Sequence, residues 1–360
     1  MTPVAPGGVI GIMGGGQLGR MLALAAARLG LKTHIYAPAG ENVAADVATN
    51  FVAGSDNYLE NLDKFARACD VITYEFENVP LAAATEACRY APLFPSSKAL
   101  ETAQDRLIEK SFLRDIGLKT VNFWAVSHVD DLRSALAEAG GDGILKTRRL
   151  GYDGHGQVRI GNNTESLDAP IAQLNKAPAI LEALAPFQRE LSVVAVRGGD
   201  GEIRCYDPAM NIHENGILRR SVVSDAASPE RSTQAHAIAA RILDRLNYVG
   251  VIGIELFEMP DGELWVNEIA PRVHNTGHWT LEACIVSQFE NHIRAICGWP
   301  LGSTERHSDA EMINLLGEDA NQWAHWAAGP HTAVHHYGKS EARTGRKMGH
   351  VTRLGTSKNP

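Results

Sequence analysis

Short apolar runs alternate with longer amphipathic runs in the N-terminal part of the chain. The pattern predicts strands that alternate with helices, and Gly30 is placed to end the first helix. Alternation at this spacing is typical of a parallel sheet wound with helices. The predicted strands span 8–12, 32–38 and a run that ends within 71–80, and the predicted helices span 21–30 and 61–68.

The pattern changes after a long helical segment predicted at 98–117, near which we place the first domain boundary. Beyond it, apolar runs come in pairs separated by Gly- or Pro-containing breaks, which predicts antiparallel strands. An amphipathic helix is predicted at 232–250. The paired runs are two strands around a Gly-rich loop in 143–161, two strands around a break in 179–198, and a hairpin in 251–271.

Composition and charge limit the classes of function. The 360 residues are 44% apolar and carry a formal net charge of −8, so the chain is a poor candidate for coating nucleic acid. No apolar run approaches the length of a membrane span. The five cysteines lie far apart without CxxC spacing, which argues against a disulfide framework and a zinc ribbon. We therefore expect a cytoplasmic protein that binds neither nucleic acid nor a membrane.

The stretch "GIMGGGQLGR" contains the GxGxxG spacing of dinucleotide-binding turns, with Gly14, Gly16 and Gly19 at its three positions. A nicotinamide site also needs an acidic residue at the end of the second strand, but Ala37 and Pro38 stand there. The spacing alone is therefore weak evidence for a nicotinamide enzyme. Backbone N–H groups at a helix N-terminus still favour a phosphate-bearing ligand. A tight turn without a ligand is the alternative.

Two glutamates face each other in the predicted hairpin. If Asp261-Gly262 is a two-residue turn, Glu255 lies directly opposite Glu268. At an effective dielectric constant of about 20, the two carboxylates repel by roughly 3 kcal/mol. A hard divalent cation such as Mg²⁺ removes this repulsion, so we interpret the pair as metal ligands. In the alternative, one glutamate faces solvent and Arg272 neutralises the other.

A lysine before the Gly-rich loop and two glutamates around a later break are candidate nucleotide contacts. Lys146 ends an apolar strand directly before the loop, which suits nucleotide phosphates because a fixed cation is followed by flexible backbone donors. An ordinary hairpin loop is the alternative. Glu182 and Glu190 stand around a Pro-containing break, where they can accept hydrogen bonds from adenine N6 and ribose hydroxyls. The alternative for them is two surface charges.

Seven strings, spread over nearly the whole chain, together resemble the ATP-grasp superfamily and, within it, the carboxyaminoimidazole ribonucleotide synthetases. The resemblance implies an α/β and α+β fold: an N-terminal wound parallel-sheet domain, a small lid subdomain and a C-terminal α+β domain. It divides the chain into a substrate-side domain (1–108), a lid subdomain (109–188), a metal and nucleotide subdomain (189–300) and a substrate-phosphate region (301–360). The strings are "GGGQLGRM", "TYEFENV", "DRLIEK", "GYDGHGQ", "NIHENGILRRS", "NEIAPRVHNTGHWT" and "YGKSEARTGRKMGH".

The resemblance also implies the residues of the site. The catalytic residues would be Lys146, Arg272 and Tyr152, and the Mg²⁺ ligands would be Glu255 and Glu268. The ATP contacts would be Arg106, Lys146, Gly151, Tyr152, Asp153, Gly154, His155, Gly156, Gln157, Glu182, Ala183, Leu184, Ala185, Glu190, His213, Asn267 and Glu268. The substrate contacts would be Gln17, Leu18, Glu75, Glu77, Asn275, Lys339, Arg346 and Lys347. Many ATP-grasp enzymes have an asparagine two residues after the second metal carboxylate, where this chain has Ala270.

The implied activity is that of an ATP-dependent carbon–nitrogen ligase of de novo purine biosynthesis. Bicarbonate and ATP would form carboxyphosphate, which would carboxylate the exocyclic amine of 5-aminoimidazole ribonucleotide and leave ADP and phosphate. The implied cofactors are ATP and Mg²⁺, and the implied assembly is a homodimer. Three alternatives stand beside this interpretation: a sister ATP-grasp ligase that uses formate and glycinamide ribonucleotide, a nicotinamide-dependent oxidoreductase, and a non-catalytic nucleotide sensor.

Overall fold

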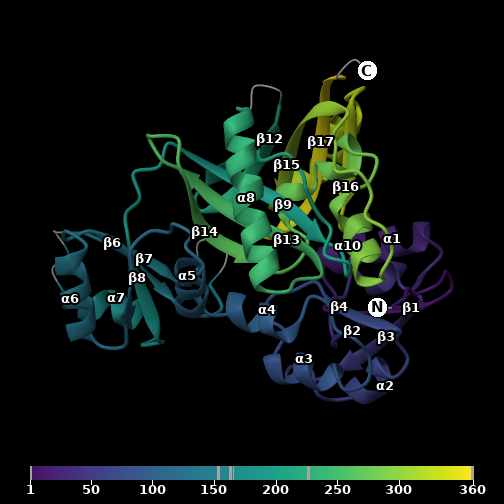
Figure 1. Ribbon diagram of the computed structural model, residues 1–360, viewed down its shortest axis with the longest axis horizontal. Helices are drawn as coiled ribbons and strands as arrows, with labels where there is room; N and C mark the ends of the chain where they lie inside the picture. Colours follow the sequence, from purple (N-terminus) through teal and green to yellow (C-terminus); the bar gives the residue numbers. More distant parts are fainter. Residues whose placement is uncertain (1, 152–154, 162–163, 165, 225–227, 358–360) are drawn as a thin grey trace.

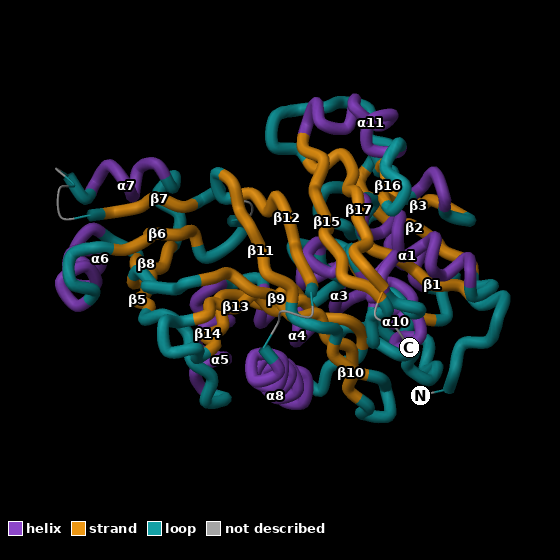
Figure 2. The backbone as a smooth tube through the Cα atoms, turned by 90° about the horizontal axis from the view of Figure 1, so that it is seen from above, coloured by secondary structure: helices purple, strands orange, loops and turns teal. Residues whose placement is uncertain are grey.

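Three sheets organise the chain in the computed structural model (Figure 1). The N-terminal residues form a parallel sheet, the middle of the chain a small antiparallel sheet, and the remainder a large antiparallel sheet. Figure 2 shows the small sheet at one end of the molecule, the N-terminal sheet at the other and the large sheet between them. The predicted combination of α/β and α+β parts is therefore confirmed. The structure describes residues 2–151, 155–161, 164, 166–224 and 228–357.

The N-terminal sheet has the strand order β3-β2-β1-β4, and its neighbouring strands are parallel, as predicted. Ile10 and Ile12 of its central strand are fully buried, and Leu22 of α1 is buried in the same apolar cluster. Gly30 follows α1 with a φ of 72°, a left-handed conformation that suits glycine at a helix end. The elements are β1 (Val9–Met13), α1 (Gln17–Arg28), β2 (Lys32–Pro38), η1 (Ala45–Val47), β3 (Asn50–Gly54), α2 (Leu62–Ala66), β4 (Val71–Tyr74) and α3 (Leu81–Ala87).

The single helix predicted at 98–117 is two helices, α4 (Ser97–Ala103) and α5 (Arg106–Asp115). Asp105 between them has an extended backbone, and its Oδ1 accepts a hydrogen bond from the N–H of Leu107 at 3.1 Å. An aspartate with this geometry is an N-cap, so a new helix begins here. The prediction of one helix was wrong because the apolar spacing continues unbroken across the cap.

The small sheet is antiparallel and has the strand order β5-β8-β6-β7. Its apolar core joins Leu145 and Leu181 of the central strands to Leu132 of helix α6. The two predicted strands around the Gly-rich loop are therefore confirmed as β6 and β7. The elements are β5 (Phe123–Val126), α6 (Val129–Glu138), β6 (Gly143–Thr147), β7 (Gln157–Ile160), α7 (Asp168–Gln173) and β8 (Ala179–Ala183).

The large sheet has nine strands within the described residues, in the order β14-β13-β9-β11-β12-β15-β17-β16, with β10 paired to β9. Helices α8 and α10 cover opposite faces of β9, because Val193 packs in one apolar cluster and Val194 in the other. The C-terminal strands join the sheet through the β12–β15 pair. The elements are β9 (Arg189–Arg197), β10 (Ile203–Cys205), β11 (Ala209–Glu214), β12 (Ile217–Val223), α8 (Pro229–Arg245), β13 (Gly250–Glu258), β14 (Leu264–Ala270), η2 (Asn275–Gly277), α9 (Thr280–Ala283), α10 (Gln288–Ile296), β15 (Ser308–Leu316), η3 (Gly317–Gln322), α11 (Trp323–Ala327), β16 (Thr332–His336) and β17 (Lys347–Ser357).

A buried contact joins the N-terminal sheet to the large sheet. Helix α1 packs against α10, and His292 of α10 forms a 2.8 Å hydrogen bond to the hydroxyl of Thr73 on β4. Both residues are fully buried. This contact lies two residues before Glu75, so it holds the end of β4 close to the large sheet. Among the described helices, none is long and apolar enough to span a membrane.

Candidate active site

The turn of the β13–β14 hairpin has three residues, not the two that the sequence predicted. The N–H of Met259 donates to the carbonyl of Glu263, and the N–H of Gly262 donates to the carbonyl of Met259, both at 2.9 Å. Gly262 has a φ of 82°, as expected for a glycine that closes a three-residue hairpin turn. The two-residue prediction was wrong, and by itself the longer turn would shift the register by one position.

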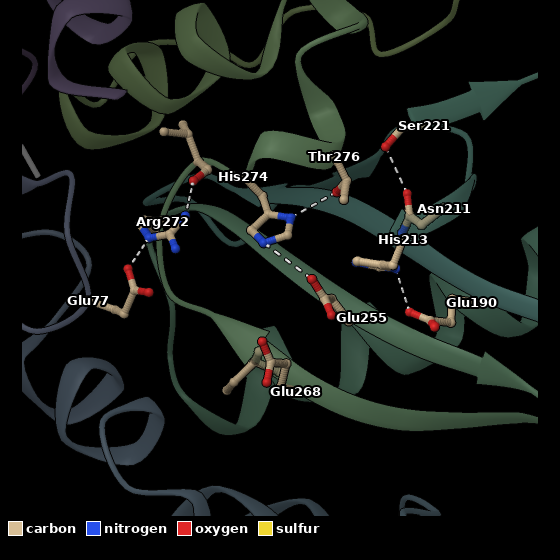
Figure 3. A network of polar contacts seen from close by, with 12 residues as sticks. Glu77, Glu190, Asn211, His213, Ser221, Glu255, Glu268, Arg272, His274 and Thr276 are labelled. Carbon is tan, nitrogen blue, oxygen red and sulfur yellow. Dashed lines mark hydrogen bonds and ion pairs between the residues drawn. The ribbon is translucent and has the colours of Figure 1, made fainter. Parts of the chain in front are cut away.

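A β-bulge in β14 restores the register. Leu256 pairs with Val266, whereas the preceding residue, Glu255, pairs with Glu268, so Asn267 is an extra residue on its strand. The prediction that Glu255 lies opposite Glu268 is therefore confirmed. The pairing results from a three-residue turn combined with a bulge, and not from the predicted two-residue turn. Figure 3 shows the two carboxylates next to each other on the hairpin.

Each of the two glutamates has a cationic or ionisable neighbour, and neither neighbour is Arg272. Arg106 Nη1 lies 2.8 Å from Glu268 Oε2, and His274 Nε2 lies 3.6 Å from Glu255 Oε1. Arg272 instead pairs with Glu77 of the N-terminal domain (Figure 3). The alternative in which Arg272 neutralises one of the glutamates is therefore wrong.

The carboxylate pair fits a divalent cation. Burial and the charge of Glu268 raise the pKa of Glu255 to about 7, because a buried carboxyl group beside a second carboxylate is unfavourable to ionise. The Oδ1 atom of the bulge residue Asn267 is buried without a hydrogen-bond partner among the described residues. Carboxylate and amide oxygens are the donors that Mg²⁺ prefers. Within the described residues no group of three His, Cys, Asp or Glu is placed to hold a metal, so the fit rests on this pair and on additional oxygen donors.

Lys146, Glu182 and Lys110 form a cluster of buried ion pairs. Glu182 is 3% exposed, and its carboxylate contacts Lys146 Nζ at 2.6 Å and Lys110 Nζ at 3.2 Å. The alternative of a surface charge is therefore wrong for Glu182. No role was predicted for Lys110, although it stands three residues before the buried Leu113, on the face of α5 that packs inward.

Glu190 and His213 form a second pair of site residues, on the neighbouring strands β9 and β11. His213 Nδ1 lies 2.7 Å from a Glu190 carboxylate oxygen (Figure 3). Glu190 pairs in register with Phe257, whose ring stacks on Phe187 with centroids 4.5 Å apart. The segment Glu182–Ala185 comes just before this stacked pair. The structure thus brings together Glu190 and His213, the residues expected at ribose and ATP.

The Gly-rich loop starts and ends next to Arg106. The N–H of Arg106 donates to the carbonyl of Arg148 at 2.9 Å, and the N–H of Thr147 donates to the carbonyl of Gly156 at 2.8 Å. Of the expected loop contacts, Gly151, His155, Gly156 and Gln157 are described, whereas Tyr152, Asp153 and Gly154 lie outside the described residues. The described ends of the loop therefore stand beside the cation expected at the phosphates.

The glycine turn before α1 holds a carboxylate of the chain itself. Glu75 Oε1 accepts from the N–H of Gly16 at 2.8 Å, and Glu75 Oε2 accepts from the N–H of Gly19 at 3.2 Å. A Cβ atom added at Gly14 would approach Glu75 within 2.6 Å, and one added at Gly16 within 2.8 Å. The glycines therefore make room for Glu75. The phosphate-bearing ligand expected at these N–H groups is not their partner here, while Gln17 and Leu18 begin the helix beside them.

The C-terminal basic residues Lys339, Arg346 and Lys347 lie close together, beside Glu41 of the N-terminal domain. Lys339 Nζ donates to the carbonyl of Lys347 at 2.8 Å, and Arg346 pairs with Glu41 of the N-terminal domain. Glu41 also accepts from the N–H of Ser340 at 2.6 Å and from its hydroxyl at 2.5 Å. Burial and then the charge of Arg346 lower the pKa of Lys339 to about 8. The predicted basic cluster exists, and Glu41, which the sequence analysis did not assign to the site, belongs to it.

Three family models match successive parts of the chain. They describe a ribonucleotide synthetase preATP-grasp domain (residues 8–104), an ATP-grasp domain (residues 111–289) and a phosphoribosylaminoimidazole carboxylase C-terminal domain (residues 310–360). These matches agree with the division of the chain into three sheets. The fold is that of an ATP-grasp ligase, with ATP and Mg²⁺ as cofactors.

Relatives define the family within this class. The chain is 49% identical over 355 residues to the N5-carboxyaminoimidazole ribonucleotide synthase of Brucella melitensis, with 98% of each chain covered. It is 43% identical over 343 residues to the synthase of Pseudomonas aeruginosa, covering 95% of this chain and 93% of the relative. The synthetase structure from Thermus thermophilus superposes with a TM-score of 0.88 at 42% identity, covering 96% of this chain and 93% of that one.

The chain belongs to the N5-carboxyaminoimidazole ribonucleotide synthase family. It is an ATP-dependent ligase of purine biosynthesis that forms N5-carboxyaminoimidazole ribonucleotide. The formate-dependent, nicotinamide-dependent and non-catalytic alternatives are therefore wrong. A synthase from Aspergillus clavatus, solved with ADP and 5-aminoimidazole ribonucleotide, has a TM-score of 0.89 at 29% identity, covering 97% of this chain and 94% of that one.

Proposed function

We propose that bicarbonate attacks the γ-phosphate of ATP between Lys146 and the β13–β14 hairpin, and that the resulting carboxyphosphate carboxylates the amine of 5-aminoimidazole ribonucleotide. The observation that carries this assignment of residues is the register of the hairpin, which sets Glu255 opposite Glu268. Adjacent carboxylates disfavour the ligand-free state and favour a bound cation. ADP and phosphate are the remaining products.

On the nucleotide side, two cations are already held by acidic partners. Lys146 contacts Glu182, and Arg106 contacts Glu268. Each cation can exchange its carboxylate for a phosphate oxygen, because both are anionic acceptors of charge-assisted hydrogen bonds. Glu255 and Glu268 would hold Mg²⁺, which supplies positive charge to the transferring phosphoryl group when bound.

Adenine would lie along Glu182–Ala185, near the stacked rings of Phe187 and Phe257. The ribose hydroxyls would be accepted by Glu190, whose carboxylate is oriented by His213. Both contacts lie on strands of rigid sheets, which keeps the nucleotide in one position relative to the carboxylate pair.

On the substrate side, Arg272 and Asn275 would line the reaction centre. Both amide atoms of the Asn275 side chain are buried without a hydrogen-bond partner among the described residues, a costly state that a polar ligand relieves. The ribonucleotide would also meet Glu75 and Glu77. Its 5′-phosphate would be bound by the basic residues of the C-terminal region, namely Lys339, Arg346 and Lys347.

Four parts of the chain would share this work, with the boundaries 1–108, 109–188, 189–300 and 301–360. The start of α5 at Arg106 places the first boundary inside a helix, so part of α5 would move with the lid subdomain. We also propose a homodimer in the cytoplasm. The free thiols of Cys69, Cys88, Cys205, Cys284 and Cys297 support a reducing compartment.

The experiment that tests the proposed site is phosphate release from Mg·ATP with bicarbonate, measured with and without 5-aminoimidazole ribonucleotide, in the wild-type chain and in Glu255→Gln. We expect ribonucleotide-dependent product in the wild type and loss of phosphate release in the variant. Wild-type phosphate release in a folded Glu255→Gln protein would contradict the assignment of the carboxylate pair. The matched control is Glu263→Gln, because Glu263 lies on the same hairpin and pairs with the exposed Lys119.

A further inference from the structure

Strand β14, which carries Glu268, lies at one edge of the large sheet. Strand β14 pairs with β13 on one side, and no strand follows it on the other in the described sheet. An edge strand that also contains a bulge has outward backbone groups that need other partners. The conformation of residues 267–269 therefore depends on what covers this edge.

Helix α5 covers the edge with two adjacent charged side chains. Lys110 Nζ donates to the carbonyl of Asn267 at 2.9 Å, and the N–H of Ile269 donates to Glu109 Oε1 at 2.6 Å. These two contacts stand on either side of Glu268. Both hydrogen bonds come from one turn of α5, so the same helix fixes the backbone before and after Glu268.

Lys110 reaches a second part of the site at the same time. Its ammonium group contacts Glu182 at 3.2 Å and the hydroxyl of Thr120 at 3.4 Å, and its side chain is fully buried. A fully buried lysine is rare unless its donors are paired. Lys110 thus makes two hydrogen bonds and one ion pair, and two of its partners, Asn267 and Glu182, belong to strands that carry ATP-site residues.

We propose that Lys110 is a positioning residue that fixes the bulge at Asn267, and through it the Glu268 carboxylate, relative to Glu182 and Lys146. The inference rests on the proposed function of Glu268 as a metal ligand. Without the Lys110 donor, the Asn267 carbonyl is left without a partner at a buried edge, and the bulge is free to relax. Glu268 then no longer stays opposite Glu255, and the cation loses one of its two carboxylates.

The test compares the Mg²⁺ dependence of turnover in Lys110→Met, which keeps the apolar stem, with that of the wild-type chain. Residues that orient metal ligands typically change metal affinity by about 10–100-fold. We therefore expect the half-saturating Mg²⁺ concentration to rise at least about tenfold, excess Mg²⁺ to restore turnover, and the KM for the ribonucleotide to stay within about twofold. Lys110→Gln keeps an N–H donor without the charge, and we expect an intermediate Mg²⁺ requirement in it.

The matched control is Lys119→Met, which removes an exposed lysine that pairs with Glu263 at the tip of the same hairpin. It should keep the wild-type Mg²⁺ dependence. A folded Lys110→Met or Lys110→Gln protein with wild-type Mg²⁺ dependence would overturn the inference, as would a loss of stability without any change in that dependence. Glu268→Gln is measured alongside: if it retains wild-type turnover, the proposed metal site has failed, whereas if only the Lys110 variants behave as wild type, the positioning role alone has failed.

Discussion

Arg106 donates to Glu268 across 2.8 Å, so the cation expected at the ATP phosphates neutralises the carboxylate expected at the metal. Burial opposes ionisation of Glu268, but the combined attraction of Arg106, Lys146 and Lys110 lowers its pKa. Glu255 has a more distant neighbour, since His274 Nε2 lies 3.6 Å from its carboxylate. The protein thus stabilises Glu268 with its own guanidinium group, whereas burial and the charge of Glu268 raise the pKa of Glu255 to about 7.

This pairing sets the expected behaviour of Glu268→Gln. Turnover should be lost, because the cation loses a charged ligand while the adenine and ribose contacts remain. The stability of the ligand-free protein should change by no more than about 1 kcal/mol, because loss of a partly exposed pair with Arg106 is offset by relief of the repulsion from Glu255. Thermal unfolding without nucleotide and ATP turnover of the same sample measure both quantities. An active variant would contradict the metal assignment.

Arg346→Ala should weaken binding of the ribonucleotide and spare ATP. Loss of a charged hydrogen bond to a phosphate typically costs about 1.5–3 kcal/mol, so the KM for the ribonucleotide should rise about tenfold or more. The KM for ATP should stay near its wild-type value. Steady-state kinetics with each substrate varied in turn provide the measurement. Equal defects for both substrates would show that Arg346 does not serve the ribonucleotide.

Glu41→Gln should have the opposite effect on the same constant. In the ligand-free protein the Glu41 carboxylate occupies Arg346 and both donors of Ser340, which are the donors that a phosphate would use. Without the negative charge, the KM for the ribonucleotide should fall by up to about fivefold, since a partly exposed ion pair is worth up to ~1 kcal/mol. Glu341→Gln is the control, because Glu341 pairs with Arg343 at the surface. A raised KM for the ribonucleotide in Glu41→Gln would show that Glu41 does not compete with the phosphate for Arg346 and Ser340.

The affinity for the ribonucleotide should depend on pH through Lys339. Burial and the charge of Arg346 lower the pKa of this ammonium to about 8, so the group is charged below that pH and loses its proton above it. The KM for the ribonucleotide should therefore be low near pH 7 and rise as the pH passes about 8. Lys339→Arg keeps the charge, so its KM should stay flat over this range. A wild-type KM for the ribonucleotide that does not change with pH would show that the charge of Lys339 does not serve ribonucleotide binding.

Local sequence patterns predicted the elements and the pairing of Glu255 with Glu268, but not the side-chain partners. The alternation of strands and helices and the Asp261-Gly262 turn signal depend on neighbouring residues, and these predictions were confirmed in outline. The turn was one residue longer than expected, and the bulge at Asn267 cancelled that error at Glu255 and Glu268. A bulge depends on what covers the strand edge, which no local pattern encodes.

The ion pairs join residues that are distant in the sequence. Arg106 and Glu268 are 162 positions apart, and Arg346 and Glu41 are 305 positions apart. Charged residues have no periodicity that would match one partner to another over such distances. Lys110 was missed for a related reason: a lysine in an amphipathic helix is normally exposed, and only a buried acid on another strand makes its burial favourable.

The Gly-rich turn before α1 and the end of β4 share one small volume, and Glu75 fills it. A Cβ at Gly16 would meet the Glu75 carboxylate at 2.8 Å, and one at Gly19 would approach the same side chain at 3.2 Å. Gly16 is thus required by the acid across from it, whereas Gly19 is also restricted by the Gly14 carbonyl at 3.2 Å and Gly14 by its own φ of 114°. In evolutionary terms, Gly16 and Glu75 should behave as one inherited unit: a lineage that replaced Glu75 with a small residue would be released from the glycine at position 16 but not from the other two.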